Sequence, residues 1–98
     1  IIFLSTISLT LFYCDNNEYT GNVTDLSQHG MFISTDGMCF PFSSEFKIAF
    51  PIKTEVLNIL VLVRRITKTK DCYDGIGVEI LNPTKHYLEY MKDLCNNL

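Results

Sequence analysis

Apolar and polar side chains alternate along much of this chain, with the period of two that is typical of a strand with one buried face. In residues 7–14, for example, Ile7, Leu9 and Leu11 share one parity while Ser8 takes the other. The same pattern recurs between clusters of turn-forming residues. It predicts six strands, over residues 7–14, 19–26, 31–35, 45–50, 56–66 and 75–80.

Short polar segments separate the predicted strands. Asn and Asp form local turns and tolerate left-handed backbone, so residues 15–18 should connect the first two strands as a hairpin, and Asp36 with Gly37 should end the third. Pro51 cannot donate a ladder hydrogen bond, so the fourth strand should end near it. Residues 68–71 form a further polar hairpin loop. This arrangement predicts a small antiparallel β-barrel, which leaves no sheet edge exposed.

Two of the predicted strands have unusual compositions. Residues 59–63 are apolar without a break, which fits a buried helix as well as a strand. The β-branched residues and the flanking turns favour a strand that is buried on both faces. The last strand contains Gly75 and Gly77, which predict a bend or the close approach of another part of the chain.

The chain ends in a predicted helix. Asn82 is a good N-cap residue, and Pro83 suits the first helical position. Apolar side chains then recur at helical spacing: Tyr87, Leu88, Met91, Leu94 and Cys95. We therefore expect an all-β fold with a single domain over residues 1–98. It would be a six-stranded antiparallel β-barrel whose C-terminal α-helix covers one mouth or one side.

Composition supports one packed domain and argues against several kinds of partner. The 98 residues leave room for a single core, and hydrophobic residues make up 47% against 19% charged residues. A formal net charge of −3 argues against DNA or RNA, whose phosphates attract basic proteins. The apolar run 1–13 is shorter than the ~20 residues of a membrane helix, so we expect no membrane insertion. These features leave the oligomeric state open.

Motifs that carry chemistry are scarce. The four cysteines are too far apart for a metal knuckle: Cys14, Cys39, Cys72 and Cys95. Their even number allows two disulfides in an oxidising compartment, but a domain with this much apolar content does not require them. We therefore expect reduced, semi-buried thiols in a cytoplasmic protein. The sequence has no phosphate-binding glycine loop and no nucleophile elbow, and neither histidine has a catalytic partner nearby in the sequence. The sequence therefore predicts a protein that binds a ligand or a partner, without enzyme activity, metal or cofactor.

The most informative segment is residues 25–33, where a strand stops at short polar side chains and resumes after a glycine. Asp25, Ser27 and Gly30 form the pattern Asp-x-Ser-x-x-Gly before an apolar strand. One explanation is structural: Asp25 and Ser27 cap the backbone of a turn, and Gly30 takes a conformation, such as positive φ, that other residues resist. The functional explanation is that this turn presents outward-facing hydrogen-bond acceptors to a ligand.

This pattern resembles the signature of the PilZ domain family. The resemblance continues with an aromatic, proline-containing loop at 38–44, strands at 46–50, 61–65 and 75–78, and a closing helix. It implies a six-stranded bacterial barrel that acts as a receptor for the second messenger cyclic di-GMP. In that family the aspartate and serine contact a guanine base and the glycine shapes the loop. The resemblance therefore implies these roles for Asp25, Ser27 and Gly30.

The sequence departs from the family pattern in one respect. PilZ receptors carry an Arg-x-x-x-Arg motif before the aspartate, which holds phosphates and stacks on guanine, but residues 1–5 contain no arginine. Either the arginines precede residue 1, or Arg64 and Arg65 supply the charge together with Lys68 and Lys70. The alternative explanation of Arg64 and Arg65 is an ordinary strand end that meets solvent.

The resemblance also implies a second function. PilZ-like members without the arginine motif act through protein contacts in type IV pilus or motility systems. A nucleotide-independent adaptor with a protein partner is therefore the alternative to a cyclic di-GMP receptor. Four aromatic side chains are candidates for an exposed protein-binding patch, unless they belong to the core: Phe40, Phe42, Tyr87 and Tyr90.

Overall fold

A computed structural model describes residues 2–13, 17–35, 37–38, 40–52 and 55–96. Within these ranges the chain forms six strands and one helix, in the predicted order. They are β1 (Ile2–Tyr13), β2 (Asn17–Leu26), β3 (Gly30–Thr35), β4 (Glu45–Ile52), β5 (Glu55–Thr69), β6 (Cys72–Leu81) and α1 (Lys85–Asn96). The six predicted strands are confirmed, although most extend beyond the predicted bounds.

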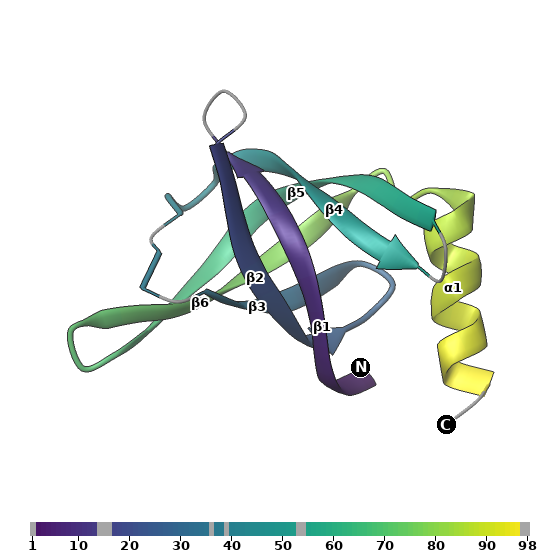
Figure 1. Cartoon of the computed structure of the whole chain (residues 1–98), viewed down its shortest axis with the longest axis horizontal. Coiled ribbons are helices and arrows are strands. Elements are labelled where there is room, and N and C mark those ends of the chain that lie inside the picture. Colours follow the sequence, from purple (N-terminus) through teal and green to yellow (C-terminus); the bar gives the residue numbers. More distant parts are fainter. Residues whose placement is uncertain (1, 14–16, 36, 39, 53–54, 97–98) are drawn as a thin grey trace.

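The strands close into an antiparallel barrel (Figure 1). Their order around the barrel is β1-β2-β3-β6-β5-β4, and pairing between β1 and β4 closes it. The β5–β6 hairpin extends away from the barrel on one side, and α1 lies at the opposite end (Figure 1). The predicted fold class, an antiparallel β-barrel with a C-terminal helix, is confirmed.

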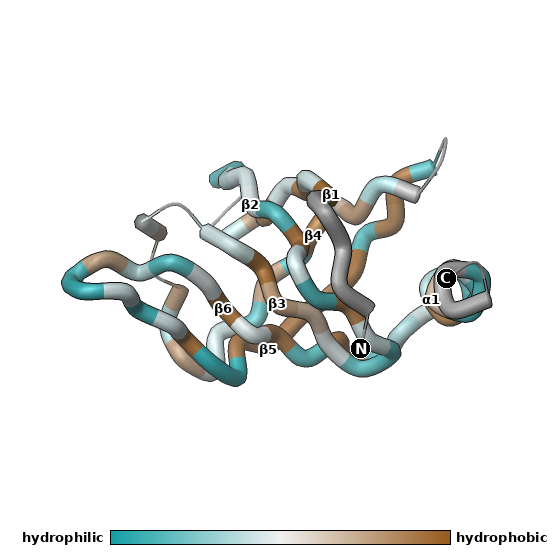
Figure 2. The backbone as a smooth tube through the Cα atoms, turned by 90° about the horizontal axis from the view of Figure 1, so that it is seen from below, coloured by the Kyte–Doolittle hydropathy of each residue, from teal (hydrophilic) through white to brown (hydrophobic). Residues whose placement is uncertain are grey.

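Apolar side chains from alternate strand positions fill the barrel, and the tube in Figure 2 shows this alternation along the strands. In β5, Ile59, Val61 and Val63 are buried, whereas Leu60 is 36% exposed. The prediction that residues 59–63 are buried on both faces is therefore wrong. One face of β5 lines the barrel interior, and none of the described elements covers the Leu60 side chain completely.

The predicted cap of the helix is also wrong. Thr84 caps α1, because the amide of Tyr87 donates to the Thr84 hydroxyl at 3.2 Å and the helix begins at Lys85. Asn82 instead has a left-handed φ of 51° and lies in the connection after β6. Asparagine suits either position, since it accepts left-handed backbone as readily as it caps a helix.

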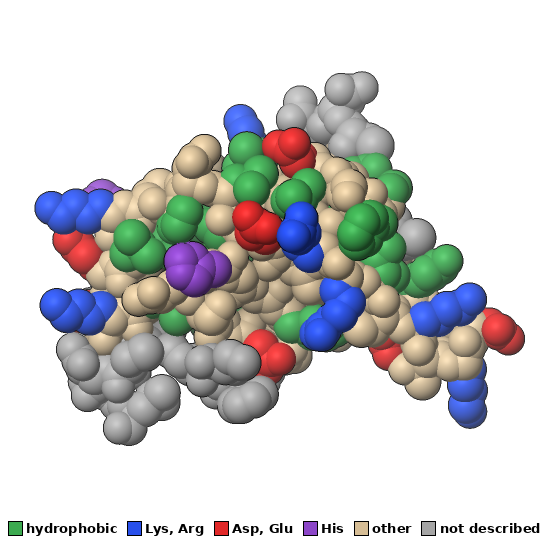
Figure 3. Space-filling view, turned by 180° about the vertical axis from the view of Figure 1, so that it is seen from behind, with side chains coloured by type: hydrophobic (Ala, Val, Ile, Leu, Met, Phe, Trp, Pro, Cys, Tyr) green, Lys and Arg blue, Asp and Glu red, His purple; other side chains and the backbone are tan. Residues whose placement is uncertain are grey.

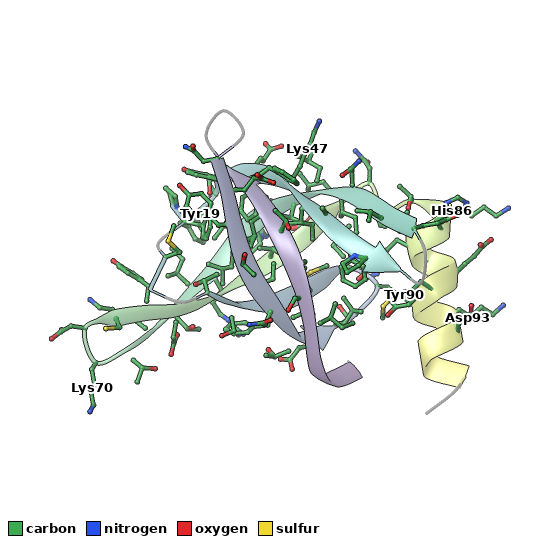
Figure 4. All side chains as sticks on the ribbon, viewed as in Figure 1. Tyr19, Lys47, Lys70, His86, Tyr90 and Asp93 are labelled. Carbon is green, nitrogen blue, oxygen red and sulfur yellow. The ribbon has the colours of Figure 1, made fainter. Side chains whose placement is uncertain are left out.

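The helix packs against its own barrel. Tyr87 and Met91 are buried, and the rings of Tyr87 and Tyr90 lie edge-on to Phe50 of β4, with centroids 6.0 and 5.8 Å away. Figure 4 shows Tyr90 on the side of α1 that faces the strands. In the part of the chain that the structure describes, no helix has the length and apolar character needed to span a bilayer.

The four aromatic candidates do not form one exposed patch. Phe40 is buried and stacks on Phe46 with ring centroids 5.1 Å apart, because the loop after β3 folds this ring into the core. Tyr87 is buried under α1 and Tyr90 is half-buried, so Phe42, at 64% exposed, is the only one of the four that is mainly exposed. The prediction of a shared patch is therefore wrong.

The cysteine prediction can be compared with the structure at one position. Cys72 is a free thiol, and it is exposed rather than semi-buried, because it begins β6 beside the tight turn of the β5–β6 hairpin. Cys14 and Cys39 lie outside the described residues, and so does the side chain of Cys95.

Candidate ligand-binding groove

A groove of about 430 Å³ opens on the outer surface of the barrel, where the β2–β3 turn lies beside β5 and β6. The side of the barrel seen in Figure 3 carries acidic and basic side chains next to one another. The five predicted binding residues all line the groove: Asp25, Ser27, Gly30, Arg64 and Arg65. The barrel therefore joins the Asp-x-Ser-x-x-Gly segment to the arginines of β5, which are distant from it in sequence.

A β-bulge in β2 turns Asp25 outward. Val23 is buried, yet Asp25 rather than Thr24 takes the next pairing with β3, so Thr24 is an extra residue in β2. In a regular strand Asp25 would point into the barrel, as Val23 does. The extra residue reverses the alternation of inward and outward side chains along β2. Leu26 is therefore buried, and the half-buried Asp25 side chain lines the groove.

A second bulge does the same for Arg65. Val63 is buried and pairs with Val78, and Arg65 pairs with the next residue of β6, Gly77, so Arg64 is the extra residue in β5. Without it Arg65 would share the inward parity of Val63. Both arginines are exposed and line the groove, and β5 continues beyond them to Thr69.

These two bulges leave a signal in the sequence, although a search for strict alternation of apolar and polar residues does not detect it. Apolar residues that belong inside the barrel lie three positions apart at each bulge, as Val23 and Leu26 do in β2 and as Val63 and Ile66 do in β5. A regular strand places such residues on opposite faces. The spacing therefore indicates an inserted residue, and polar side chains between the apolar pair are the ones turned outward.

Hydrogen bonds fix the turn at residues 27–30. The Ser27 amide donates to the Gly30 carbonyl at 2.9 Å, and the Gly30 amide donates to the Ser27 hydroxyl at 3.2 Å. The Ser27 carbonyl accepts a 2.7 Å bond from the Tyr87 hydroxyl of α1. Burial, with a smaller contribution from Tyr90, raises the pKa of Tyr87, so this hydroxyl stays protonated as a donor.

The structural explanation of the motif holds for Ser27 but not for Asp25. The Ser27 hydroxyl is engaged by the Gly30 backbone, as a turn cap would be. Among the described residues, no hydrogen bond or ion pair engages the Asp25 carboxylate, which lines the groove. Asp25 is therefore an acceptor that a ligand can reach.

Gly30 is required for close approach and not for positive φ. Its φ lies outside the left-handed region, so the prediction of positive φ is wrong. A Cβ atom at this position would lie 2.6 Å from the Val78 carbonyl oxygen of the neighbouring strand. Because that oxygen belongs to the backbone of β6, it cannot move aside cheaply.

The cations near the groove differ in their surroundings. The Arg64 guanidinium lies 3.4 Å from the Glu79 carboxylate, and both side chains are well exposed. Arg65 lies over the ring of Phe32. Lys68 lies instead over Tyr73, and Lys70 is at the tip of the β5–β6 hairpin (Figure 4), so the structure does not bring either lysine into the groove.

The sequence and the fold of this barrel are similar to those of a known family. The family model of the PilZ domain matches residues 7–97. This chain belongs to the PilZ domain family. Its fold is similar to that of the PilZ domain with c-di-GMP of YcgR from Escherichia coli, with a TM-score of 0.74 and 14% identity over 96% of this chain and 82% of that one. No curated protein gives a match.

This PilZ domain has groove residues that the sequence reasoning did not identify. Phe32 and Glu79 both line the groove, and each contacts one of the two arginines. Phe32 lies two positions after the motif glycine, on the parity opposite to the buried Met31 and Ile33. An aromatic side chain on the outer face of a strand beside a binding motif is the signal that could have singled it out.

Proposed function

We propose that this PilZ domain is a receptor or effector domain of bacterial signalling that binds cyclic di-GMP in the groove. The observation that carries the proposal is the position of Arg64 and Arg65, which line the same groove as Asp25. A ligand with both guanine bases and phosphates needs hydrogen-bond acceptors and cations within reach of one another. The groove offers both, although residues 1–5 lack the usual arginine motif.

Asp25 is proposed to recognise guanine. The paired N–H donors on the Watson–Crick edge of guanine match the two oxygens of a carboxylate. The Asp25 side chain is half-buried in the groove wall and has no partner among the described residues, so a base does not have to displace one. A hydrogen bond to a charged group contributes about 1.5–3 kcal/mol, which makes this contact a main source of affinity.

Arg65 and Arg64 are proposed to hold the phosphates. A guanidinium group binds a phosphate through two parallel N–H bonds and keeps its charge at any physiological pH. Arg65 has no carboxylate partner among the described side chains, whereas Arg64 is shared with Glu79. Arg65 is therefore expected to contribute more than Arg64.

Ser27 and Gly30 are proposed to act by shaping the groove. Their mutual hydrogen bonds hold the turn next to Asp25, and Gly30 allows β3 to lie close against Val78. The Ser27 hydroxyl is bonded to the Gly30 backbone as both donor and acceptor, which leaves it one lone pair for an N–H group of a base. Their contribution to binding is then mainly the position of the turn.

Titration calorimetry with cyclic di-GMP at physiological salt tests the proposal. Micromolar binding, about −8 kcal/mol, is expected for the unmodified chain. Arg65→Ala and Asp25→Ala should each weaken binding about 10-fold or more. Lys68→Ala removes a cation of the same strand outside the groove and serves as the matched control, with an affinity within about 2-fold of the unmodified chain.

The same titration separates the receptor from the adaptor. Heat of binding whose Kd rises about 10-fold or more in Arg65→Ala supports the receptor. No heat at several hundred micromolar ligand would contradict nucleotide binding and leave the adaptor, a PilZ-like domain that binds a protein partner of a type IV pilus or motility system.

A further inference from the structure

Phe32 lies on the outer face of the barrel over two glycines of β6. It pairs directly with Gly77, and a Cβ atom at Gly75 would lie 2.4 Å from the tip of the Phe32 ring. A side chain at Gly75 would therefore collide with the ring. The glycines of β6 leave the space in which the aromatic ring lies against the sheet.

The guanidinium of Arg65 is held over this ring. Its central carbon lies 5.6 Å from the centroid of Phe32, within the range of a cation–π contact. Gly77 lies beneath this contact, since a Cβ atom there would be 3.3 Å from the Arg65 Cβ. Phe32, Gly77 and Arg65 all line the groove.

From this stack we infer that Phe32 is a positioning residue for ligand binding, which holds the Arg65 guanidinium in place for a phosphate or a base of cyclic di-GMP. The inference rests on the proposed function and adds a residue outside the Asp-x-Ser-x-x-Gly pattern. A free arginine side chain samples many rotamers and loses them when it binds an anion. A ring that already restricts the guanidinium reduces this loss and leaves its N–H groups exposed for the ligand.

The hairpin contains a natural control for this inference. Lys68 and Tyr73 form a second cation–π pair between β5 and β6, with the ammonium nitrogen 5.3 Å from the ring centroid. This pair connects the same two strands as the Arg65 and Gly77 pairing but does not line the groove. Removal of its ring should affect the hairpin without affecting the ligand.

The test is a double-mutant cycle measured by calorimetry with cyclic di-GMP. Phe32→Leu should raise Kd about 3- to 10-fold through loss of the cation–π contact. In the Arg65→Ala background the same change should raise Kd less than about 2-fold, because the group that the ring positions is gone. Phe32→Tyr keeps the ring and should restore the affinity, and Tyr73→Leu should leave Kd within about 2-fold of the unmodified chain.

Folding is checked separately by NMR of the ligand-free variants. In the unmodified chain the side-chain protons of Arg65 should be shifted upfield by the Phe32 ring, and this shift should vanish in Phe32→Leu while the backbone spectrum of the barrel persists. If the unmodified chain binds and Phe32→Leu binds equally well, or Phe32→Tyr fails to restore binding, the inference is wrong and the proposed function stands. If the unmodified chain does not bind at all, both are wrong.

Discussion

The carboxylate of Glu79 would compete with the proposed ligand for Arg64. The two side chains lie 3.4 Å apart at the edge of the groove, and a phosphate that binds Arg64 has to replace this contact. An ion pair as exposed as this one contributes about 0.2–1 kcal/mol, so the competition is modest. Glu79 nevertheless adds a negative charge where the ligand brings its own.

Glu79→Gln is therefore expected to strengthen binding. It frees Arg64 and removes the repulsion between the carboxylate and the phosphates, and the Kd for cyclic di-GMP should fall about 2- to 5-fold. Glu89→Gln, which changes an exposed acid of α1 outside the groove, is the matched control. Calorimetry at two salt concentrations measures both, and an unchanged or weaker affinity for Glu79→Gln would contradict a phosphate site at Arg64.

Gly30→Ala is expected to destabilise the barrel. The added methyl group would lie 2.6 Å from the Val78 carbonyl oxygen, and β3 and β6 would have to separate to admit it. Forcing an extra methyl group into a packed site costs about 1–3 kcal/mol of unfolding free energy. Gln28→Ala, at an exposed position of the same turn, should cost less than about 0.5 kcal/mol. Urea denaturation measures both, and equal stabilities would overturn the close-approach role of Gly30.

The Tyr87 side chain joins α1 to the turn at residues 27–30. The hydroxyl of Tyr87 in α1 donates to the carbonyl of Ser27, and the ring is fully buried under the helix. The Ser27 carbonyl therefore depends on α1 for a hydrogen bond. The position of the helix and the shape of the turn should vary together.

Tyr87→Phe tests this connection. The loss of one hydrogen bond to a partly buried carbonyl should lower the unfolding free energy by about 1–2 kcal/mol and weaken cyclic di-GMP binding slightly. Tyr90→Phe is the control, since its ring also lies against Phe50 and no described residue accepts its hydroxyl. Urea denaturation measures the unfolding free energy of both variants, and calorimetry measures their affinity for cyclic di-GMP. If Tyr87→Phe loses no more unfolding free energy than Tyr90→Phe, the connection between α1 and the turn is refuted.

The same tyrosine predicts a pH dependence. Burial raises the pKa of Tyr87 above the ordinary 10.0 in the folded state, so folding favours its protonated form. Its contribution to stability is complete below pH 10.0 and is lost as the pH rises further toward the raised folded pKa. Between neutral and strongly alkaline pH, the unfolding free energy of Tyr87→Phe should therefore fall less than that of the unmodified chain. Urea denaturation across this pH range measures both, and equal losses in the two proteins would contradict the prediction.

At the scale of the whole molecule, the sequence predicts the barrel better than the groove. The strands could be predicted because alternation is a local property, and the helix because its apolar spacing is equally local. The helix start was misplaced because both Asn82 and Thr84 are suitable cap residues, and only the path of the chain after β6 decides between them. The inward face of β5 depends on barrel closure, which a single strand does not reveal.

The groove could be predicted only in part. The Asp-x-Ser-x-x-Gly pattern indicates the turn, and the family resemblance indicates the ligand class. Two bulges turn Asp25 and Arg65 outward. In the sequence they are visible only as a three-residue spacing of inward apolar side chains, from Val23 to Leu26 and from Val63 to Ile66. That Arg64 and Arg65 lie near Asp25 follows from the pairing of β3 with β6 and of β6 with β5, which is tertiary information.

A titration followed by ¹H–¹⁵N NMR shows directly whether cyclic di-GMP binds in the groove. With the ligand in the groove, the largest chemical-shift changes should fall on amides of the turn at 27–30 and on those of Arg64, Arg65 and Gly77. A second groove, of about 560 Å³, lies between that turn and α1 and is lined by Leu88 and Met91. Shift changes that centre on those helix residues, or no shift changes at all, would rule out binding in the groove.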